Sequence, residues 1–291
     1  MKYYTYFPGC SSAHGGAKAY DTSTRAVAKI LDVELIELED WNCCGSTPYS
    51  SMDELASHCC SARNLALAEK RGIDLVSPCS SCYVMLNRTN LALGENHELR
   101  AKVSEALASG NLQYQGIIKV RHLLDVFAHD VTSDEIKSHI KKDLSNLKVA
   151  PYYGCQVVRP QPSFDHPEYP TSMDKLIESL GAKATPFPLK ARCCGGSLML
   201  SEENIGLELA QKLLANAVSN GADIIVTVCP LCQTNLDLYQ SKINKKFKTK
   251  YNIPILFFTQ LIGIAFGIDN KTLGLEKGIV PTEKILAGYI K

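Results

Sequence analysis

The sequence predicts an α/β fold made of two repeated units, each a small parallel sheet flanked by helices. Short apolar, β-branched or aromatic runs alternate with helical patterns in both halves, which is typical of βαβ units. One set of five cysteines also occurs in each half in the same order. An internal repeat of this kind indicates two copies of one unit, which we expect to be related by a pseudo-twofold axis.

Ten of the twelve cysteines belong to the repeat. The first set is Cys10, Cys43, Cys44, Cys79 and Cys82, and the second set is Cys155, Cys193, Cys194, Cys229 and Cys232. In both halves 36 positions separate the start of the adjacent pair from the start of the Cys-x-x-Cys motif. The leading cysteine precedes the pair by 33 positions in the first half and by 38 in the second, so the loop between them varies in length.

In the first half, the expected strands are 3–7, 33–38 and 73–76, and the expected helices are 17–31 and 52–70. Gly72 is placed to end the second helix. In the second half, the expected strands are 148–152, 183–186 and 223–228, and the expected helices are 172–180 and 202–219. Gly221 is placed in the same way to end the second helix of the second half. The predicted domains are therefore 1–147 and 148–291, each with its own five-cysteine set.

Every cysteine of the two sets follows the end of an expected strand. Because ligands collect at the carboxyl ends of parallel strands, cysteines far apart in sequence are expected to converge on one pocket in each half. A Cys-x-x-Cys motif at a strand-to-helix turn points both sulfurs to one side, where the helix N-terminus stabilises thiolates. Gly45 and the Gly195-Gly196 pair would let backbone N–H groups approach sulfur.

Thiolates at these spacings select zinc or iron–sulfur clusters. Structural zinc needs four thiolates, so a fifth is superfluous, and a cubane 4Fe-4S cluster also needs only four. The side chains of adjacent cysteines diverge, which favours several metal atoms over one. Spacing alone leaves zinc, a cubane cluster with a spare thiol and a larger cluster open.

Composition and sequence pattern indicate the cellular compartment of the protein and the partners that it does not bind. The chain has 31 basic and 30 acidic residues, a formal net charge of +1, so no electrostatic case for nucleic acid follows. The N-terminus lacks the pattern of a signal peptide, and twelve cysteines in a reducing cytoplasm indicate metal rather than disulfides. The apolar segment 253–268 is too short for a membrane span and is predicted to be a buried helix.

The cysteine pattern, with Cys44-Gly45 and Cys194-Gly195 completing two Cys-Cys-Gly motifs, resembles the tandem CCG domain of the B subunit of heterodisulfide reductase. The resemblance covers nearly the whole chain and includes segments 62–65, 167–170, 229–232 and 258–261. It implies that each five-cysteine set holds a noncubane 4Fe-4S cluster, giving two clusters whose ligands are all ten cysteines. We expect the two clusters to be the catalytic centre.

The resemblance also implies a function. The reaction would be reduction of a disulfide, in that family the mixed disulfide of coenzyme M and coenzyme B used in methanogenesis. The ferredoxin-like C subunit and the flavoprotein A subunit of the same complex would supply electrons, because this chain has no ferredoxin cysteine run. The alternative is an electron-transfer or anchoring CCG subunit of a succinate/fumarate or lactate/glycolate oxidoreductase complex. A third possibility is a zinc scaffold without redox chemistry.

Several residues outside the ten repeated cysteines could also serve function, but each has an ordinary structural explanation. Cys59 and Cys60 have no partner in the repeat and are expected to be helix positions. His122 aligns with segment 258–261, where Gln260 replaces it, and is expected to start a helix rather than bind metal. His14 is expected in a solvated loop, although it lies close to Cys10 in sequence.

The other such residues are positively charged or aromatic. Arg159 is expected to anchor a turn, with binding of an anionic substrate as the other interpretation. The lysines of 242–250 are expected to be a solvated helix end, with docking to an acidic partner as the minority interpretation. Trp41 is expected to pack over the first pocket.

Overall fold

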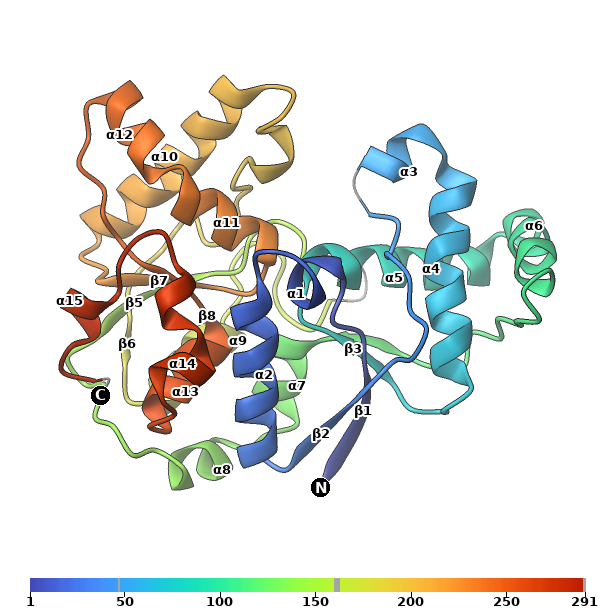
Figure 1. Cartoon of the computed structure of the whole chain (residues 1–291), viewed down its shortest axis with the longest axis horizontal. Helices are drawn as coiled ribbons and strands as arrows, with labels where there is room; N and C mark the ends of the chain where they lie inside the picture. Colours follow the sequence, from blue (N-terminus) through green and yellow to red (C-terminus); the bar gives the residue numbers. More distant parts are fainter. Residues whose placement is uncertain (47, 160–162, 290–291) are drawn as a thin grey trace.

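The computed structural model describes residues 1–46, 48–159 and 163–289 and contains two four-stranded parallel sheets with equivalent strand orders, β2-β1-β3-β4 and β6-β5-β7-β8 (Figure 1). The strands of the first sheet are β1 (Lys2–Tyr6), β2 (Val33–Glu37), β3 (Leu75–Ser77) and β4 (Val120–His122). Those of the second are β5 (Lys148–Tyr152), β6 (Lys183–Ala184), β7 (Ile224–Thr227) and β8 (Ile255–Phe257). All pairings are parallel, which confirms the predicted α/β fold of two repeated units.

Helices of the first half connect and cover its sheet. They are α1 (Cys10–Ala13), α2 (Lys18–Ile30), α3 (Pro48–Met52), α4 (Glu54–Glu69), α5 (Ser80–Glu95), α6 (His97–Ala108), α7 (Leu123–His129) and α8 (Ser133–Ser138). The four helices expected in the two halves form within two residues of their predicted ends. Gly72 and Gly221 both have positive φ, at 65° and 75°, which fits their predicted place just after a helix.

The second half repeats this arrangement. Its α-helices are α9 (Ser172–Ser179), α10 (Glu203–Ser219), α11 (Pro230–Leu238), α12 (Gln240–Phe247), α13 (Phe258–Ala265), α14 (Asn270–Leu273) and α15 (Glu283–Leu286). Short 3-10 turns form at η1 (Gly196–Leu198) and η2 (Leu275–Lys277). Among the described residues, no helix combines the length and the apolar character needed to cross a bilayer.

Each sheet has a fourth strand that the sequence did not reveal. β4 and β8 have only three residues each and run directly into a helix, so neither shows the alternation of a longer strand. The prediction that 253–268 is one buried helix was wrong in its first part. Ile255–Phe257 pairs with β7, and the buried helix α13 begins only at Phe258.

The two halves pack closely. The larger hydrophobic core contains buried residues from both of them. Helix α2 of the first half lies beside α13 of the second (Figure 1). There the ring of Tyr20 stacks on Phe257, with centroids 4.1 Å apart, and the hydroxyls of Ser23 and Thr259 hydrogen-bond at 2.7 Å. The boundaries 1–147 and 148–291 stay a prediction, and residues 290 and 291 lie outside the described part.

Candidate metal centres

The ends of the strands gather the cysteines as expected. Cys10 begins α1 just after β1, while Cys79 and Cys229 are the N-cap residues of α5 and α11, just after β3 and β7. The adjacent pairs, Cys43-Cys44 and Cys193-Cys194, lie in the loops that follow β2 and β6. All twelve cysteines are free thiols.

The first set forms a chain of sulfur contacts. Cys44 interacts with the thiols of Cys43 and Cys82, and these two contacts lower the pKa of Cys44 to about 4. Cys82 in turn interacts with Cys79. The pKa of Cys43 is raised mainly by its hydrogen bond to Cys44. The charge of the exposed Cys10 raises the pKa of Cys43 further. The five side chains therefore share one locality although they are spread over 73 positions of sequence.

The second set is equally compact. Cys194 Sγ and Cys232 Sγ form a hydrogen bond of 3.4 Å. Cys193 interacts with the thiols of Cys155 and Cys194, which lowers the pKa of Cys193 to about 2. Cys229 interacts with Cys232.

The two sets meet between Cys79 and Cys229. The side chain of Cys79 interacts with that of Cys229, and this contact is the main cause that raises the pKa of Cys79. The hydrogen bonds from Cys232 and Cys79 together lower the pKa of Cys229 well below its usual value. Both sulfurs sit in the interior, with Cys79 7% exposed and Cys229 3% exposed. The sulfur sites of the two halves are thus joined inside the protein.

The Cys-Cys-Gly motifs wrap backbone N–H groups around sulfur. The amide of Gly195 donates to Cys193 Sγ at 3.3 Å, and the amide of Gly196 donates to Cys194 Sγ at 3.4 Å. Gly195 has φ of 79°, and a Cβ there would lie 2.8 Å from the Cα of Gly206. The turn that aims these amides at sulfur therefore requires glycine.

Glycine also precedes each leading cysteine and lets its loop approach the Cys-x-x-Cys motif. A Cβ on Gly9 would lie 2.9 Å from Cys82 Sγ, and one on Gly154 would lie 3.3 Å from Cys232 Sγ. Both glycines have positive φ, at 73° and 75°. In each half, a glycine therefore allows the backbone before the leading cysteine to pass close to the sulfurs.

Buried polar side chains fix the adjacent pairs, and sequence reasoning did not identify them. Ser61 Oγ donates to the carbonyl of Cys44 at 2.6 Å, and Asn235 Nδ2 donates to the carbonyl of Cys194 at 2.6 Å. Both residues lie on helices and are at most 2% exposed. The signal that could have revealed them is a polar residue on the apolar face of a helix.

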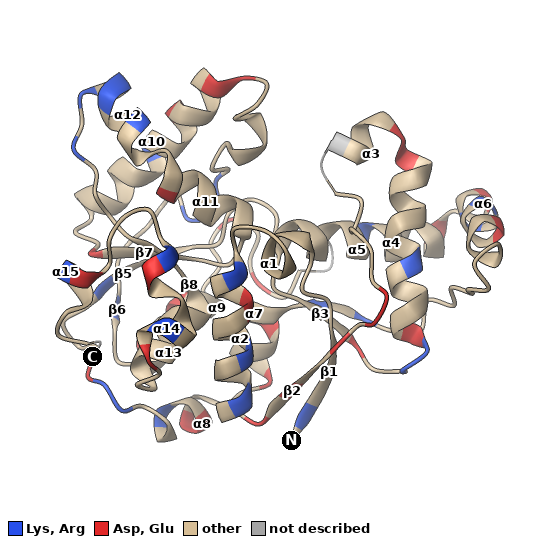
Figure 2. Cartoon of the chain, in the orientation of Figure 1, with Lys and Arg blue, Asp and Glu red and all other residues tan. Residues whose placement is uncertain are grey.

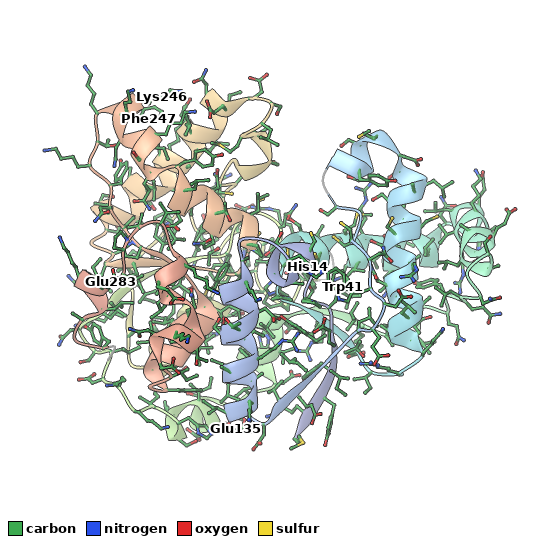
Figure 3. All side chains as sticks on the ribbon, in the orientation of Figure 1. His14, Trp41, Glu135, Lys246, Phe247 and Glu283 are labelled. Atoms are coloured by element: carbon green, nitrogen blue, oxygen red, sulfur yellow. The ribbon has the colours of Figure 1, made fainter. Side chains whose placement is uncertain are left out.

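Each set opens to its own surface. Cys10 and Cys43 line a groove of about 830 Å³, where the rings of His14 and Trp41 stack 5.6 Å apart (Figure 3). Trp41 thus packs over the first site as expected. Cysteines of the second set line a cavity of about 50 Å³, which Ser80 and Ser81 of the first half help to close. The groove and the cavity have no lining residue in common.

The remaining cysteines and His122 take the places expected of them, with one correction. Cys59 and Cys60 lie on α4, where burial raises the pKa of Cys60 and the charge of the nearby Cys44 adds to the effect. His122 caps the start of α7, since its Nδ1 accepts from the amide of Leu124 at 3.0 Å. Its counterpart in the repeat is Phe257, because both residues end the fourth strand of their sheet, so matching His122 with Gln260 was wrong.

The charged residues of interest have structural partners. Arg159 donates through Nη1 to the carbonyls of Cys155 and Ala191, both at 2.8 Å, so it anchors the turn after Cys155. The exposed lysines of 242–250 lie on α12 and the loop after it (Figure 2). Lys242 pairs there with Glu203 of α10. This arrangement is the solvated helix end that the sequence indicated.

The donor set fits an iron–sulfur group. Within the described ranges, no three His, Cys, Asp or Glu side chains are arranged to hold a single metal ion as they stand. The thiols contact one another instead. The donors in each locality are soft sulfur ligands with backbone N–H groups directed at them, which is the environment that iron–sulfur clusters use.

The fold and the paired sulfur sites define a class of protein, an α/β tandem repeat with one soft-ligand site in each half. The model of the cysteine-rich domain family, CCG, matches residues 4–87 and 149–237. The chain belongs to this family.

Three curated relatives match over nearly their whole length. The chain is 37% identical to the 8-methylmenaquinol:fumarate reductase membrane anchor subunit of Wolinella succinogenes, covering 98% of this chain and 99% of that one. It is 32% identical to a protein of Archaeoglobus profundus named as similar to the B subunit of heterodisulfide reductase, covering 98% and 97%. It is 31% identical to the B subunit of the ferredoxin/F(420)H(2)-dependent CoB-CoM heterodisulfide reductase of Methanosarcina acetivorans, covering 92% and 90%.

A solved structure shares the fold. The crystal structure of a hypothetical protein from Helicobacter pylori superposes with a TM-score of 0.75 at 19% identity, over 96% of this chain. The chain spans about half of that protein, 52% of its length. The curated relatives are subunits of oxidoreductases, which supports a redox role for this chain within a complex of several subunits.

Proposed function

We propose that this chain is the electron-transferring CCG subunit of an oxidoreductase complex of the succinate/fumarate type. All ten cysteines of the two sets would serve as ligands, and each set would hold one noncubane 4Fe-4S cluster. Such clusters supply one-electron transfer when bound. The 37% identity to the fumarate reductase subunit over almost the full length of both chains is the observation that carries this proposal.

The arrangement of the sulfurs supports a path through the protein. Cys79 and Cys229 would bring the two metal groups close together in the interior. Cys10 and Cys43 give the first set its own exposed groove, while the second set opens to a cavity that shares no residue with that groove. Two sulfur sites that adjoin inside the protein and line separate hollows suit a relay between two partners.

The second candidate function is reduction of a disulfide, as the resemblance to heterodisulfide reductase implies. Relatives of that name at 31% and 32% identity favour it, as do two complete cysteine sets. The reaction consumes two electrons and two protons and releases two thiols. It would require both sets to reach one substrate, and the separate openings favour the relay over such a joint site.

We propose two further proteins of the complex, a flavoprotein and a ferredoxin-like protein, as partners in either case, because the chain carries no ferredoxin cysteine run of its own. The cytoplasm remains the proposed location, since twelve free thiols need a reducing compartment.

The deciding experiment isolates the complex anaerobically through a tag on this chain. Roughly eight irons and matching acid-labile sulfide per chain are expected for two 4Fe-4S clusters. With a quinol analogue as the electron donor, the complex should reduce fumarate and leave the coenzyme M–coenzyme B disulfide unreduced. Turnover of the disulfide without fumarate reduction would select the second candidate. Two zinc ions and no sulfide would reject redox chemistry altogether.

A further inference from the structure

His122 lies at the junction of the two cysteine sets and is completely buried. It ends β4 beside β3, where it pairs in register with Ser77, two residues before Cys79. The backbone carbonyls of Pro78 and Val228 and the side chain of Cys229 all lie close enough to its ring to affect its pKa. Pro78 and Val228 are the residues that directly precede the two Cys-x-x-Cys motifs.

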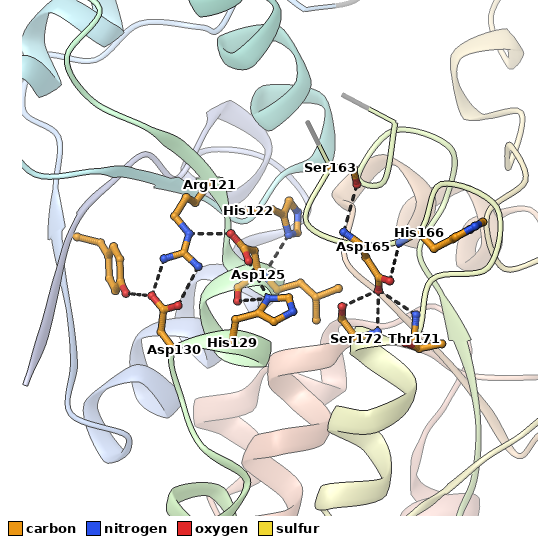
Figure 4. Close-up of polar contacts among 12 residues, drawn as sticks. Arg121, His122, Asp125, His129, Asp130, Ser163, Asp165, His166, Thr171 and Ser172 are labelled. Atoms are coloured by element: carbon orange, nitrogen blue, oxygen red, sulfur yellow. Dashed lines mark hydrogen bonds and ion pairs between the residues drawn. The ribbon is translucent and has the colours of Figure 1, made fainter. Parts of the chain in front are cut away.

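The structure fixes which ring nitrogen carries the proton. Nδ1 accepts the amide hydrogen of Leu124 at 3.0 Å, so Nδ1 is unprotonated (Figure 4). Because an imidazolium donates from both of its nitrogens, a ring whose Nδ1 accepts a hydrogen bond is neutral. A neutral imidazole with a bare Nδ1 carries its hydrogen on Nε2.

That Nε2–H group has no acceptor of hydrogen-bonding geometry among the described residues. The carbonyls of Pro78 and Val228 lie near the ring, but neither reaches Nε2 with the distance and angle of a hydrogen bond. Two aromatic rings hold the imidazole in place. Tyr83 meets it edge-on at 5.5 Å, and Phe164, which comes from the second half, stacks on it at 6.5 Å with 14° between the ring planes. A fixed, buried donor without a partner indicates an acceptor that the protein chain itself does not supply.

We propose that His122 Nε2–H donates a hydrogen bond to the sulfur of the metal group held by the second set, at the Cys229 ligand. This inference rests on the proposed iron–sulfur function and adds a positioning residue to it. A donor on sulfur stabilises the more negative, reduced state of a cluster and so raises its reduction potential. The counterpart of His122 is Phe257, which has no donor, so this interaction belongs to one side of the repeat only.

Two substitutions separate the role of Nδ1, which caps helix α7, from the role of Nε2–H, which donates to sulfur. In His122→Asn the amide oxygen replaces Nδ1, so the cap on Leu124 is kept and the Nε2 donor is lost. In His122→Gln the amide nitrogen reaches the position of Nε2, so the donor is kept and the cap is lost. A purely structural histidine would be affected mainly by the second change, and a histidine bonded to sulfur mainly by the first.

The test is an anaerobic redox titration of the loaded protein followed by electron paramagnetic resonance. The signal of the second centre is identified as the one that Cys194→Ser removes. We expect its midpoint potential to fall in His122→Asn and to stay at the wild-type value in His122→Gln, with the signal of the first centre unchanged in both. Labelling histidine with ¹⁵N should add a weak nitrogen coupling to the second signal, which His122→Asn removes.

An unchanged potential in His122→Asn, or equal shifts in both variants, would overturn the proposal. A chain that binds no iron and no sulfide would reject the proposed function and this inference together. A chain that binds both, with unaltered potentials, rejects only the inference.

Discussion

The sulfurs of Cys79 and Cys229 interact at the point where the two repeated units join. Each is the N-cap of its helix, so the positive ends of the α5 and α11 dipoles converge on this contact. A thiolate buried in the interior is unfavourable because it loses its hydration. The two helix N-termini offset this cost by stabilising the negative charge. The repeat thus places a buried cysteine of each set at the junction, while each set also lines a hollow of its own.

The first prediction concerns magnetic coupling across this junction. If each set holds a paramagnetic centre, the two spins are close enough to interact, and the reduced protein should show a split or broadened resonance. Cys194→Ser should remove the second centre, halve the iron content and leave the first signal narrow and unsplit. Iron analysis and electron paramagnetic resonance of the same samples measure both effects.

The matched control for this prediction is Cys59→Ser, because Cys59 lies on α4 outside both sets. It should retain full iron and the split resonance. Loss of both signals in Cys194→Ser would mean that the sites do not fill independently. Full iron in that variant would remove Cys194 from the ligand set.

The second prediction separates backbone strain from a steric clash at glycine. Gly195→Ala and Gly221→Ala both place a side chain at positive φ, which costs about 1 kcal/mol. At Gly221 nothing lies within 4 Å of the new Cβ, whereas at Gly195 the Cβ would lie 2.8 Å from the Cα of Gly206. Clash with backbone should add about 2 kcal/mol.

Urea unfolding of the two loaded variants should therefore show a loss of stability of about 1 kcal/mol for Gly221→Ala and about 3 kcal/mol for Gly195→Ala. Gly195→Ala should also lose iron from the second site, since the amides that face Cys193 and Cys194 would move. Equal losses of stability would show that the backbone around Gly206 relaxes freely.

The sequence predicted the fold and the gathering of the cysteines because both depend on local patterns. The 36-position spacing, shared by both halves, and the glycines after each adjacent pair predicted two equivalent sites at the strand ends. The strands β4 and β8 were not predicted, since three residues do not reveal a period. The error in aligning His122 with Gln260 followed from missing them.

The contact between Cys79 and Cys229 was beyond sequence reasoning for a different reason. It depends on how the halves pack, and that packing is set by particular long-range pairs such as Tyr20 with Phe257 and Ser81 with Gln156. No spacing along the chain encodes these pairs. The separate openings of the two sites follow from the same packing.

The third prediction tests whether Trp41 protects the first centre. Trp41 stacks on His14 and meets Phe7 edge-on at 5.4 Å, beside the exposed Cys10 and Cys43. Trp41→Ala should open the groove further and speed the loss of iron from the first centre in air, with the second centre unaffected. Trp41→Phe keeps a ring on His14 and serves as the control. Equal rates of bleaching in the two variants would contradict a shielding role.

The fourth prediction is a pH dependence of stability that comes from Asp130. Arg121 donates to both carboxylate oxygens of Asp130, and Tyr4 donates its hydroxyl to the same carboxylate (Figure 4). Burial acts to raise the pKa of Asp130, but these donors outweigh it and hold the pKa below its usual value. The carboxylate therefore contributes stability above the ordinary pKa of aspartate, and this contribution is lost as the pH falls through the lowered one.

Asp130→Asn should thus unfold about 2 kcal/mol more easily than the wild type at pH 7, because hydrogen bonds to a charged group are lost. The difference should stay constant down to about pH 5 and shrink below about pH 4, where the wild-type carboxylate takes up a proton. Comparing both proteins at each pH cancels the effect of acid on bound metal. The control is Asp134→Asn at an exposed position, whose stability should match that of the wild type at every pH. If the loss of stability in Asp130→Asn persists undiminished at the lowest pH, the charge of the carboxylate is not its source.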